Sequence, residues 1–225
     1  WGEITMRRAL INSRNIPAIQ AMQQVADEVG MDQIAEFASN LGIDYGEELY
    51  EAAGLGGSGG SNPLSMSAAY AAFGRGGIYI EPYAYTKIVY IESEEEYVRP
   101  IEQERVMSEE TAYMITDILV DAGVSGVGGN FSISGTDIAA KGGTSTIDSE
   151  SAKKLGVPSY TTPNHWNITY SPDYSIALWF GYDDLRDGYL TSGTGYGPRR
   201  QIMAAVAKRI YKTGSRFKQP SGVVS

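Results

Sequence analysis

Two short patterns that lie far apart in the chain combine residue types able to carry out acyl transfer. Ser13 and Asn15 stand two positions apart, and Lys141 is followed by two glycines and Thr144. In an acyl-transfer site without histidine, a nearby lysine generates the serine alkoxide, and fixed hydrogen-bond donors stabilise the oxyanion. Each pattern has an ordinary alternative, because Ser and Asn commonly cap helices and a lysine beside glycines is usually solvated at a turn. The surrounding sequence has to decide between these interpretations.

The composition excludes several other kinds of site. The 225 residues contain no cysteine, which rules out disulfides, thiolate catalysis and cysteine-bound zinc. The single histidine, His165, makes a Ser-His-Asp mechanism fragile, and we expect it in a loop or at a strand end rather than as a ligand. Asp183, Asp184 and Asp187 lack the spacing of a calcium loop, so a solvated turn is expected there, and no metal or cofactor is predicted. The net charge of −9 argues against nucleic acid as a partner.

Helix signals dominate the first half of the chain and strand signals the second, which predicts an α+β fold with a sheet covered by helices. Helices are expected at residues 5–10, 16–29, 31–41 and 62–74, after Ser108, and from Gly197-Pro198 to Ile210. Extended segments are expected at 78–91, 137–145, 166–170 and 174–182, the last two as an antiparallel pair. Loops are expected at the glycine-rich stretches 54–61 and 123–129, and over about twenty polar residues after Ser145.

The sequence around both patterns resembles the transpeptidase domain of the high-molecular-mass, class A penicillin-binding proteins. That family uses a Ser-x-x-Lys nucleophile, then a Ser-x-Asn type triplet, then a Lys-Thr-Gly strand. Similar landmarks occur here in the family's order at residues 2–10, 12–18, 62–73, 76–79, 108–113 and 179–184. The resemblance covers residues 2 to about 184, and more loosely the last helix. It makes residues 1–225 part of a single transpeptidase domain.

The resemblance implies a β-lactamase/transpeptidase-like fold, with an antiparallel sheet covered by helices. It also implies a D,D-transpeptidase that cross-links peptidoglycan by serine acyl transfer. The substrate would be a stem peptide ending in D-alanyl-D-alanine, and β-lactam antibiotics would inhibit the enzyme covalently. The expected location is the extracytoplasmic face of the bacterial cell membrane, anchored through an upstream segment that is not in this chain.

The resemblance also assigns roles to individual residues. Ser13 would relay a proton between the lysine of the nucleophile motif and the departing amine, and Asn15 would bind the substrate's peptide carbonyl and hold that lysine. Lys141 would supply positive charge beside this relay and beside the substrate's terminal carboxylate. Gly143 would let the substrate backbone lie against the strand. Thr144 would offer its backbone N–H as half of the oxyanion hole.

Ser145, the next residue of this strand, would also belong to the substrate-binding residues. One position departs from the family pattern: Gly142 stands where Thr or Ser is usual, which removes a hydroxyl and could lower activity or β-lactam affinity.

The nucleophile motif of the family does not occur among the twelve residues before Ser13. Two later matches begin at Ser151 and Ser215, and both follow Lys141, so we interpret them as fortuitous. The simplest explanation is a fragment whose missing N-terminal segment supplies the serine, its lysine and part of the helical core. The alternatives are a penicillin-binding sensor or scaffold without turnover, and a D,D-carboxypeptidase or β-lactamase on the same scaffold.

Overall fold

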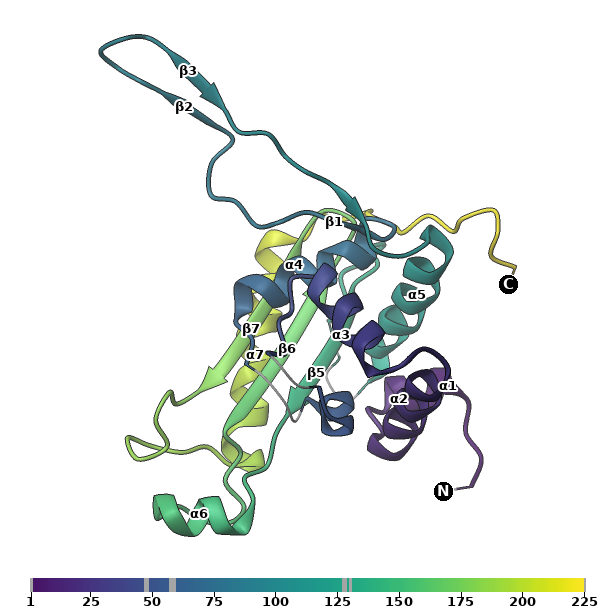
Figure 1. Cartoon of the computed structure of the whole chain (residues 1–225), viewed down its shortest axis with the longest axis vertical. Helices are drawn as coiled ribbons and strands as arrows, with labels where there is room; N and C mark the ends of the chain where they lie inside the picture. Colours follow the sequence, from purple (N-terminus) through teal and green to yellow (C-terminus); the bar gives the residue numbers. More distant parts are fainter. Residues whose placement is uncertain (1, 47–48, 57–59, 127–128, 130, 225) are drawn as a thin grey trace.

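The computed structural model describes residues 2–46, 49–56, 60–126, 129 and 131–224. Its centre is an antiparallel sheet of three strands, β5 (Ala139–Thr144), β6 (Asn164–Tyr170) and β7 (Ser175–Gly181), in the order β5-β6-β7. Helices α4 (Pro63–Gly74) and α5 (Glu109–Ser125) cover one face, and α7 (Ser192–Ile210) covers the other (Figure 1). The predicted α+β fold, an antiparallel sheet between helices, is confirmed.

The two faces of the sheet have separate apolar cores because successive side chains of a strand point to opposite sides. Ala139 packs with Tyr170 and with Leu119 of α5. Its neighbour Ala140 packs with Met203 of α7 on the other face. This alternation assigns every residue of β5 to the α5 side or the α7 side.

Three helices lie in the N-terminal region, α1 (Met6–Ile11), α2 (Asn15–Val29) and α3 (Met31–Asn40), close to the expected bounds. Thr5 caps α1 by accepting a hydrogen bond from the backbone N–H of Arg8. Arg7 of α1 forms ion pairs with Asp117 and Asp121 of α5. These contacts hold the turn between α1 and α2, which contains Ser13, beside the sheet.

An arm extends from the body between α4 and α5 (Figure 1). It begins where β1 (Ile78–Tyr79) pairs with β4 (Glu104–Arg105), and it continues as a hairpin of β2 (Lys87–Val89) and β3 (Glu96–Val98). The predicted extended segment 78–91 is therefore two short strands with an interruption around Pro82, which lacks a backbone N–H for a ladder.

Two predicted helix boundaries and one predicted loop are wrong. The last helix begins at Ser192 rather than at Gly197, because Thr191 and Thr194 form a reciprocal cap, and Pro198 lies inside the helix. The expected polar loop after Ser145 contains α6 (Ser149–Leu155), which Asp148 caps. Helix α5 continues through Gly123, where a side chain would collide with the backbone oxygen of Ile138.

The first two residues of the other expected glycine-rich loop, 54–61, belong instead to a short 3-10 helix, η1 (Glu51–Leu55). Residues 57–59, 127 and 128 of the two predicted glycine-rich loops lie outside the described residues. Within the described ranges, no helix is both long enough and apolar enough to span a membrane.

Candidate active site

The structure brings Lys141 and Ser13 together across 128 positions of the chain. The Nζ of Lys141 donates a hydrogen bond to the Oγ of Ser13 at 2.8 Å and another to the carbonyl oxygen of Gly142 at 2.5 Å. Lys141 lies on the α5 side of β5, because it alternates with Ala140, whose side chain packs on α7. The two sequence patterns therefore form one polar site.

Ser13 occupies a strained position in the turn between α1 and α2. Its φ of 51° lies in the left-handed region, which is uncommon for a residue other than glycine. Two backbone hydrogen bonds hold the turn: Ser13 donates to Leu10 at 3.0 Å, and Arg14 donates to Ala9 at 3.0 Å. Strained backbone of this kind often occurs at functional sites. Here it directs the Ser13 hydroxyl toward Lys141.

The environment of Lys141 favours loss of its proton. Burial lowers the pKa of its ammonium group below the ordinary lysine value, and the positive charge of Arg199 lowers it further. No ion pair among the described residues includes Lys141. An anionic substrate group bound beside this ammonium would stabilise its charged form.

β5 is an edge strand of the described sheet, so one side of its backbone faces away from β6. Ser145 donates its N–H to the carbonyl of Asn164 at 3.2 Å, which makes these two residues a hydrogen-bonded pair. In an antiparallel ladder such pairs alternate with pairs whose backbone groups point outward. The backbone N–H and C=O of Thr144 and of Gly142 therefore point to the open edge.

The remaining predicted site residues lie in different surroundings. The hydroxyl of Ser145 accepts a hydrogen bond from the side chain of Asn164 at 3.0 Å, so it supports the pairing of β5 with β6. Thr144 is exposed at the end of β5. Asn15 is the first residue of α2 and is exposed, and its side chain has no hydrogen-bonding partner among the described residues.

Arg199 is a site residue that the sequence patterns did not reveal. It lies on α7, is 1% exposed, and donates from Nη1 to the carbonyl oxygen of Gly143 at 2.6 Å. Its guanidinium carbon lies 4.8 Å from the centre of the Tyr196 ring. No motif or spacing signals this contact, because it joins the last helix to a strand 56 positions earlier.

His165 was expected in a loop or at a strand end, and it is the second residue of β6. Its side chain is fully buried. It pairs across the ladder with Thr144 and packs against Gly195 of α7. Burial and the nearby Arg199 lower the pKa of its imidazole. Both of its ring nitrogens lack hydrogen-bonding partners among the described residues.

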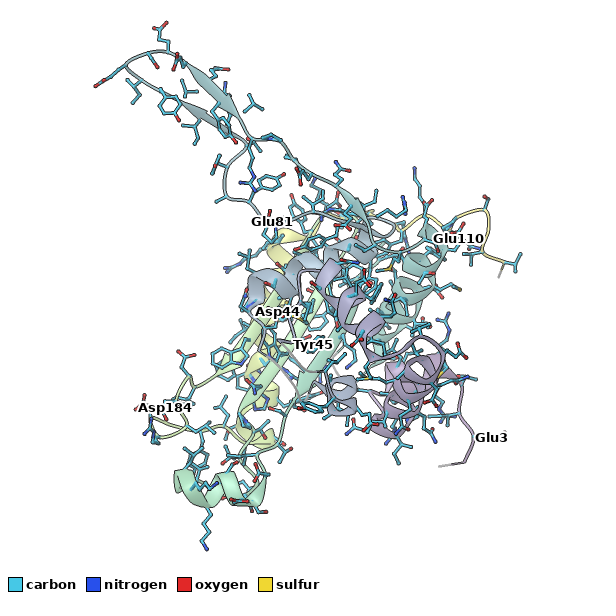
Figure 2. All side chains as sticks on the ribbon, viewed as in Figure 1. Glu3, Asp44, Tyr45, Glu81, Glu110 and Asp184 are labelled. Atoms are coloured by element: carbon cyan, nitrogen blue, oxygen red, sulfur yellow. The ribbon has the colours of Figure 1, made fainter. Side chains whose placement is uncertain are left out.

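The two later Ser-x-x-Lys matches make other contacts. Lys154 of the first pairs with Glu150 on α6, and Ser215 of the second donates a hydrogen bond to Asp173. Asp184 pairs with Arg186 in the exposed loop after β7 (Figure 2). Within the described part of the chain, no three acidic or histidine side chains gather closely enough to hold a metal ion.

Comparison with known proteins identifies the family. The family model described as "Penicillin binding protein transpeptidase domain" matches residues 1–211. Penicillin-binding protein 1A/1B of Bacillus subtilis is 34% identical over 99% of this chain and 24% of its own length. Penicillin-binding protein 1A of Streptococcus oralis is 33% identical over 87% of this chain and 32% of its own length. The chain thus spans about a quarter to a third of these relatives.

Solved structures share the fold. Penicillin-binding protein 1A of Haemophilus influenzae matches 98% of this chain with 36% of its own, at a TM-score of 0.73 and 22% identity. PonA1 of Mycobacterium tuberculosis matches 98% of this chain with 63% of its own, at a TM-score of 0.73 and 20% identity. Penicillin-binding protein A of M. tuberculosis, as a ceftriaxone acyl-enzyme complex, matches 92% of this chain with 50% of its own, at a TM-score of 0.63 and 22% identity. Because the family model matches residues 1–211 of the 225, this chain belongs to the penicillin-binding protein transpeptidase domain family.

Proposed function

We propose that residues 1–225 form part of a D,D-transpeptidase domain that cross-links peptidoglycan stem peptides and is acylated by β-lactams. The observation that carries the proposal is the 2.8 Å contact between Lys141 Nζ and Ser13 Oγ beside the open edge of β5. It joins the amino group of a lysine, a hydroxyl and a strand edge open to a peptide, which are groups that can bind a peptide ending in a carboxylate and pass a proton to its departing amine.

The reaction is an acyl transfer in two steps. A nucleophilic serine attacks the carbonyl between the last two D-alanines, and its proton passes to the lysine of its own motif. The C–N bond then breaks, and the departing amine of the terminal D-alanine takes a proton through the hydroxyl of Ser13. An amine of a second stem peptide attacks the resulting ester, which forms the cross-link and frees the serine.

The substrate lies along the open edge of β5 in this proposal. The outward N–H of Thr144 donates to the carbonyl oxygen as negative charge develops on it, and Gly143 allows close approach of the substrate backbone. Lys141 attracts the terminal carboxylate. Asn15, exposed and without a partner among the described residues, is free to bind the substrate's amide group.

The nucleophile comes, in this proposal, from another part of the same domain. No Ser-x-x-Lys sequence precedes Ser13 in the printed chain, and the chain spans only part of its relatives. The segment that carries the nucleophilic serine would precede residue 1 in the protein and pack against the 225 residues as part of the same domain. An upstream membrane anchor would place the domain on the extracytoplasmic face of the cell membrane, where stem peptides are.

Labelling with a fluorescent penicillin, followed by analysis of cross-linked muropeptides, tests the proposal. The full-length protein is expected to be labelled and to form cross-links, whereas residues 1–225 alone should remain unlabelled. Labelling without cross-links would favour a sensor or scaffold. D-alanine release without cross-links would favour a carboxypeptidase, and rapid hydrolysis of nitrocefin would favour a β-lactamase.

A further inference from the structure

Arg199 is a buried charge whose retention needs a physical reason. It is 1% exposed, and none of the ion pairs among the described residues includes it. Its Nε is buried without a hydrogen-bonding partner in the described structure. A buried charge without a counter-ion strongly destabilises a fold. An apolar residue at this position of α7 would therefore be expected if packing alone mattered.

The contact that Arg199 makes is directed at one peptide group. Its Nη1 donates to the carbonyl oxygen of Gly143 at 2.6 Å. That oxygen and the N–H of Thr144 belong to the same planar, trans peptide unit, so the two groups point in opposite directions. A contact that holds the Gly143 carbonyl toward β6 therefore also holds the N–H of Thr144 toward the open edge of β5.

Two neighbours make this contact possible. Gly142 faces α7, because it alternates with Lys141 on the α5 side, and it places no side chain between the helix and the strand. The ring of Tyr196, also on α7, lies 4.8 Å from the guanidinium carbon of Arg199 and stabilises its positive charge by a cation–π interaction. The glycine that departs from the family pattern thus lies on the face from which Arg199 approaches.

We propose that Arg199 is a positioning residue that clamps the Gly143–Thr144 peptide and thereby aims the Thr144 N–H at the reacting carbonyl oxygen. This inference rests on the proposed function for the role of that N–H, whereas the clamp itself is a property of the fold. The charged donor also polarises the peptide group, which makes its N–H a stronger hydrogen-bond donor.

Solid-state NMR of the full-length protein tests the clamp without using activity. Labelling glycine with ¹³C at the carbonyl and threonine with ¹⁵N selects Gly–Thr peptide bonds, of which residues 1–225 contain three, at 135–136, 143–144 and 193–194. Thr144→Ser assigns the 143–144 signal by removing it. Arg199→Met is expected to move the Gly143 carbonyl signal upfield, because a charged hydrogen bond is lost, and to leave the 135–136 signal in place.

Acylation kinetics of the same proteins test the consequence. With a fluorescent penicillin, Arg199→Met should slow the acylation step about 10- to 100-fold, as expected for a misaligned catalytic group. The dissociation constant of the initial complex should change less than about threefold, because substrate does not touch Arg199. Arg199→Lys retains a positive charge and a hydrogen-bond donor, so its Gly143 carbonyl signal should move less, and its acylation should slow less, than in Arg199→Met. Arg209→Met, which removes an equal charge at an exposed position of α7, should behave as wild type.

In every variant that folds, the chemical shift of the Gly143 carbonyl and the acylation rate must change together. If Arg199→Met does not fold, the same two measurements on Arg199→Lys test the clamp. An unmoved Gly143 signal in a folded variant overturns the clamp. A moved signal with a wild-type acylation rate overturns its catalytic role. If the wild-type protein is never acylated, the proposed function fails, and the carbonyl shift alone then decides whether the clamp exists.

Discussion

Substitutions at Ser13 separate the contribution of its hydroxyl group from that of its backbone conformation. Ser13→Ala removes the oxygen that accepts a hydrogen bond from Lys141 and keeps a side chain at a φ of 51°. A hydrogen bond to a charged group contributes roughly 1.5–3 kcal/mol when it is buried. Ser13 is exposed, so water replaces part of that contact, and we expect the free energy of unfolding to fall by about 1 kcal/mol.

Ser13→Gly removes the same hydroxyl and also relieves the backbone. The left-handed conformation costs a residue with a Cβ roughly 1–2 kcal/mol, which glycine avoids. Glycine loses more chain entropy on folding, by about 0.5–1 kcal/mol. The Ser13→Gly protein is therefore expected to be about 0.5–1 kcal/mol more stable than the Ser13→Ala protein, as measured by urea unfolding.

The two variants should nevertheless be equally impaired in acylation. If the Ser13 hydroxyl relays a proton, its loss should slow acylation of the full-length protein by a fluorescent penicillin about 10²- to 10⁴-fold in both. Stability and activity then rank the variants differently. Two results would refute this reasoning: wild-type acylation by either variant, or a recovery of rate in Ser13→Gly that follows its stability.

Three further predictions concern the support of the site. Gly195→Ala places a Cβ 2.2 Å from Nε2 of the buried His165, so thermal unfolding should show that the free energy of unfolding falls by about 1–3 kcal/mol. Gly193→Ala is the control, because the atom nearest to its added Cβ lies at 3.7 Å and its stability should hardly change. Equal losses of stability in the two variants would contradict this prediction. The pKa of His165 is lowered in the fold, so below about pH 6.5 the unfolded chain binds more protons than the folded chain. The free energy of unfolding should therefore fall between about pH 7.5 and 5.5, and it should fall more steeply in wild type than in His165→Gln. Equal slopes in the two proteins would contradict this prediction. Since the pKa of Lys141 is also lowered, acylation by a carboxylate-bearing β-lactam should decline with rising pH at a midpoint below the ordinary lysine value of 10.5, and a midpoint at or above it would count against the site.

The part of the site that rests on local signals could be predicted from the sequence. The helix from Asn15 to Val29 shows an apolar stripe and a proline in its first turn, and β5 shows a short apolar run before Lys141. Both elements lie within two residues of the expected bounds, so the positions of Ser13 and Lys141 at an element end and on a strand could be anticipated. Their meeting rested on the resemblance to a family.

The missed features depend on contacts between distant segments or on side-chain capping. Helix α6 lies in a polar stretch without an apolar stripe, and its start depends on Asp148 accepting hydrogen bonds from two backbone N–H groups. The start of α7 depends on the reciprocal cap between Thr191 and Thr194, in a stretch whose glycines and proline argue against a helix. The contact of Arg199 with Gly143 requires the packing of α7 on the sheet, which no local pattern encodes.

Mapping of the β-lactam adduct by peptide mass spectrometry tests the central claim most directly. After incubation of the full-length protein with a penicillin, we predict an adduct on a serine that is followed three residues later by lysine, in a segment N-terminal to residues 1–225. The same experiment with Lys141→Ala should give much less adduct, because the cation beside Ser13 is lost. An adduct on Ser151, on Ser215 or on any other residue of the 225 would contradict the account.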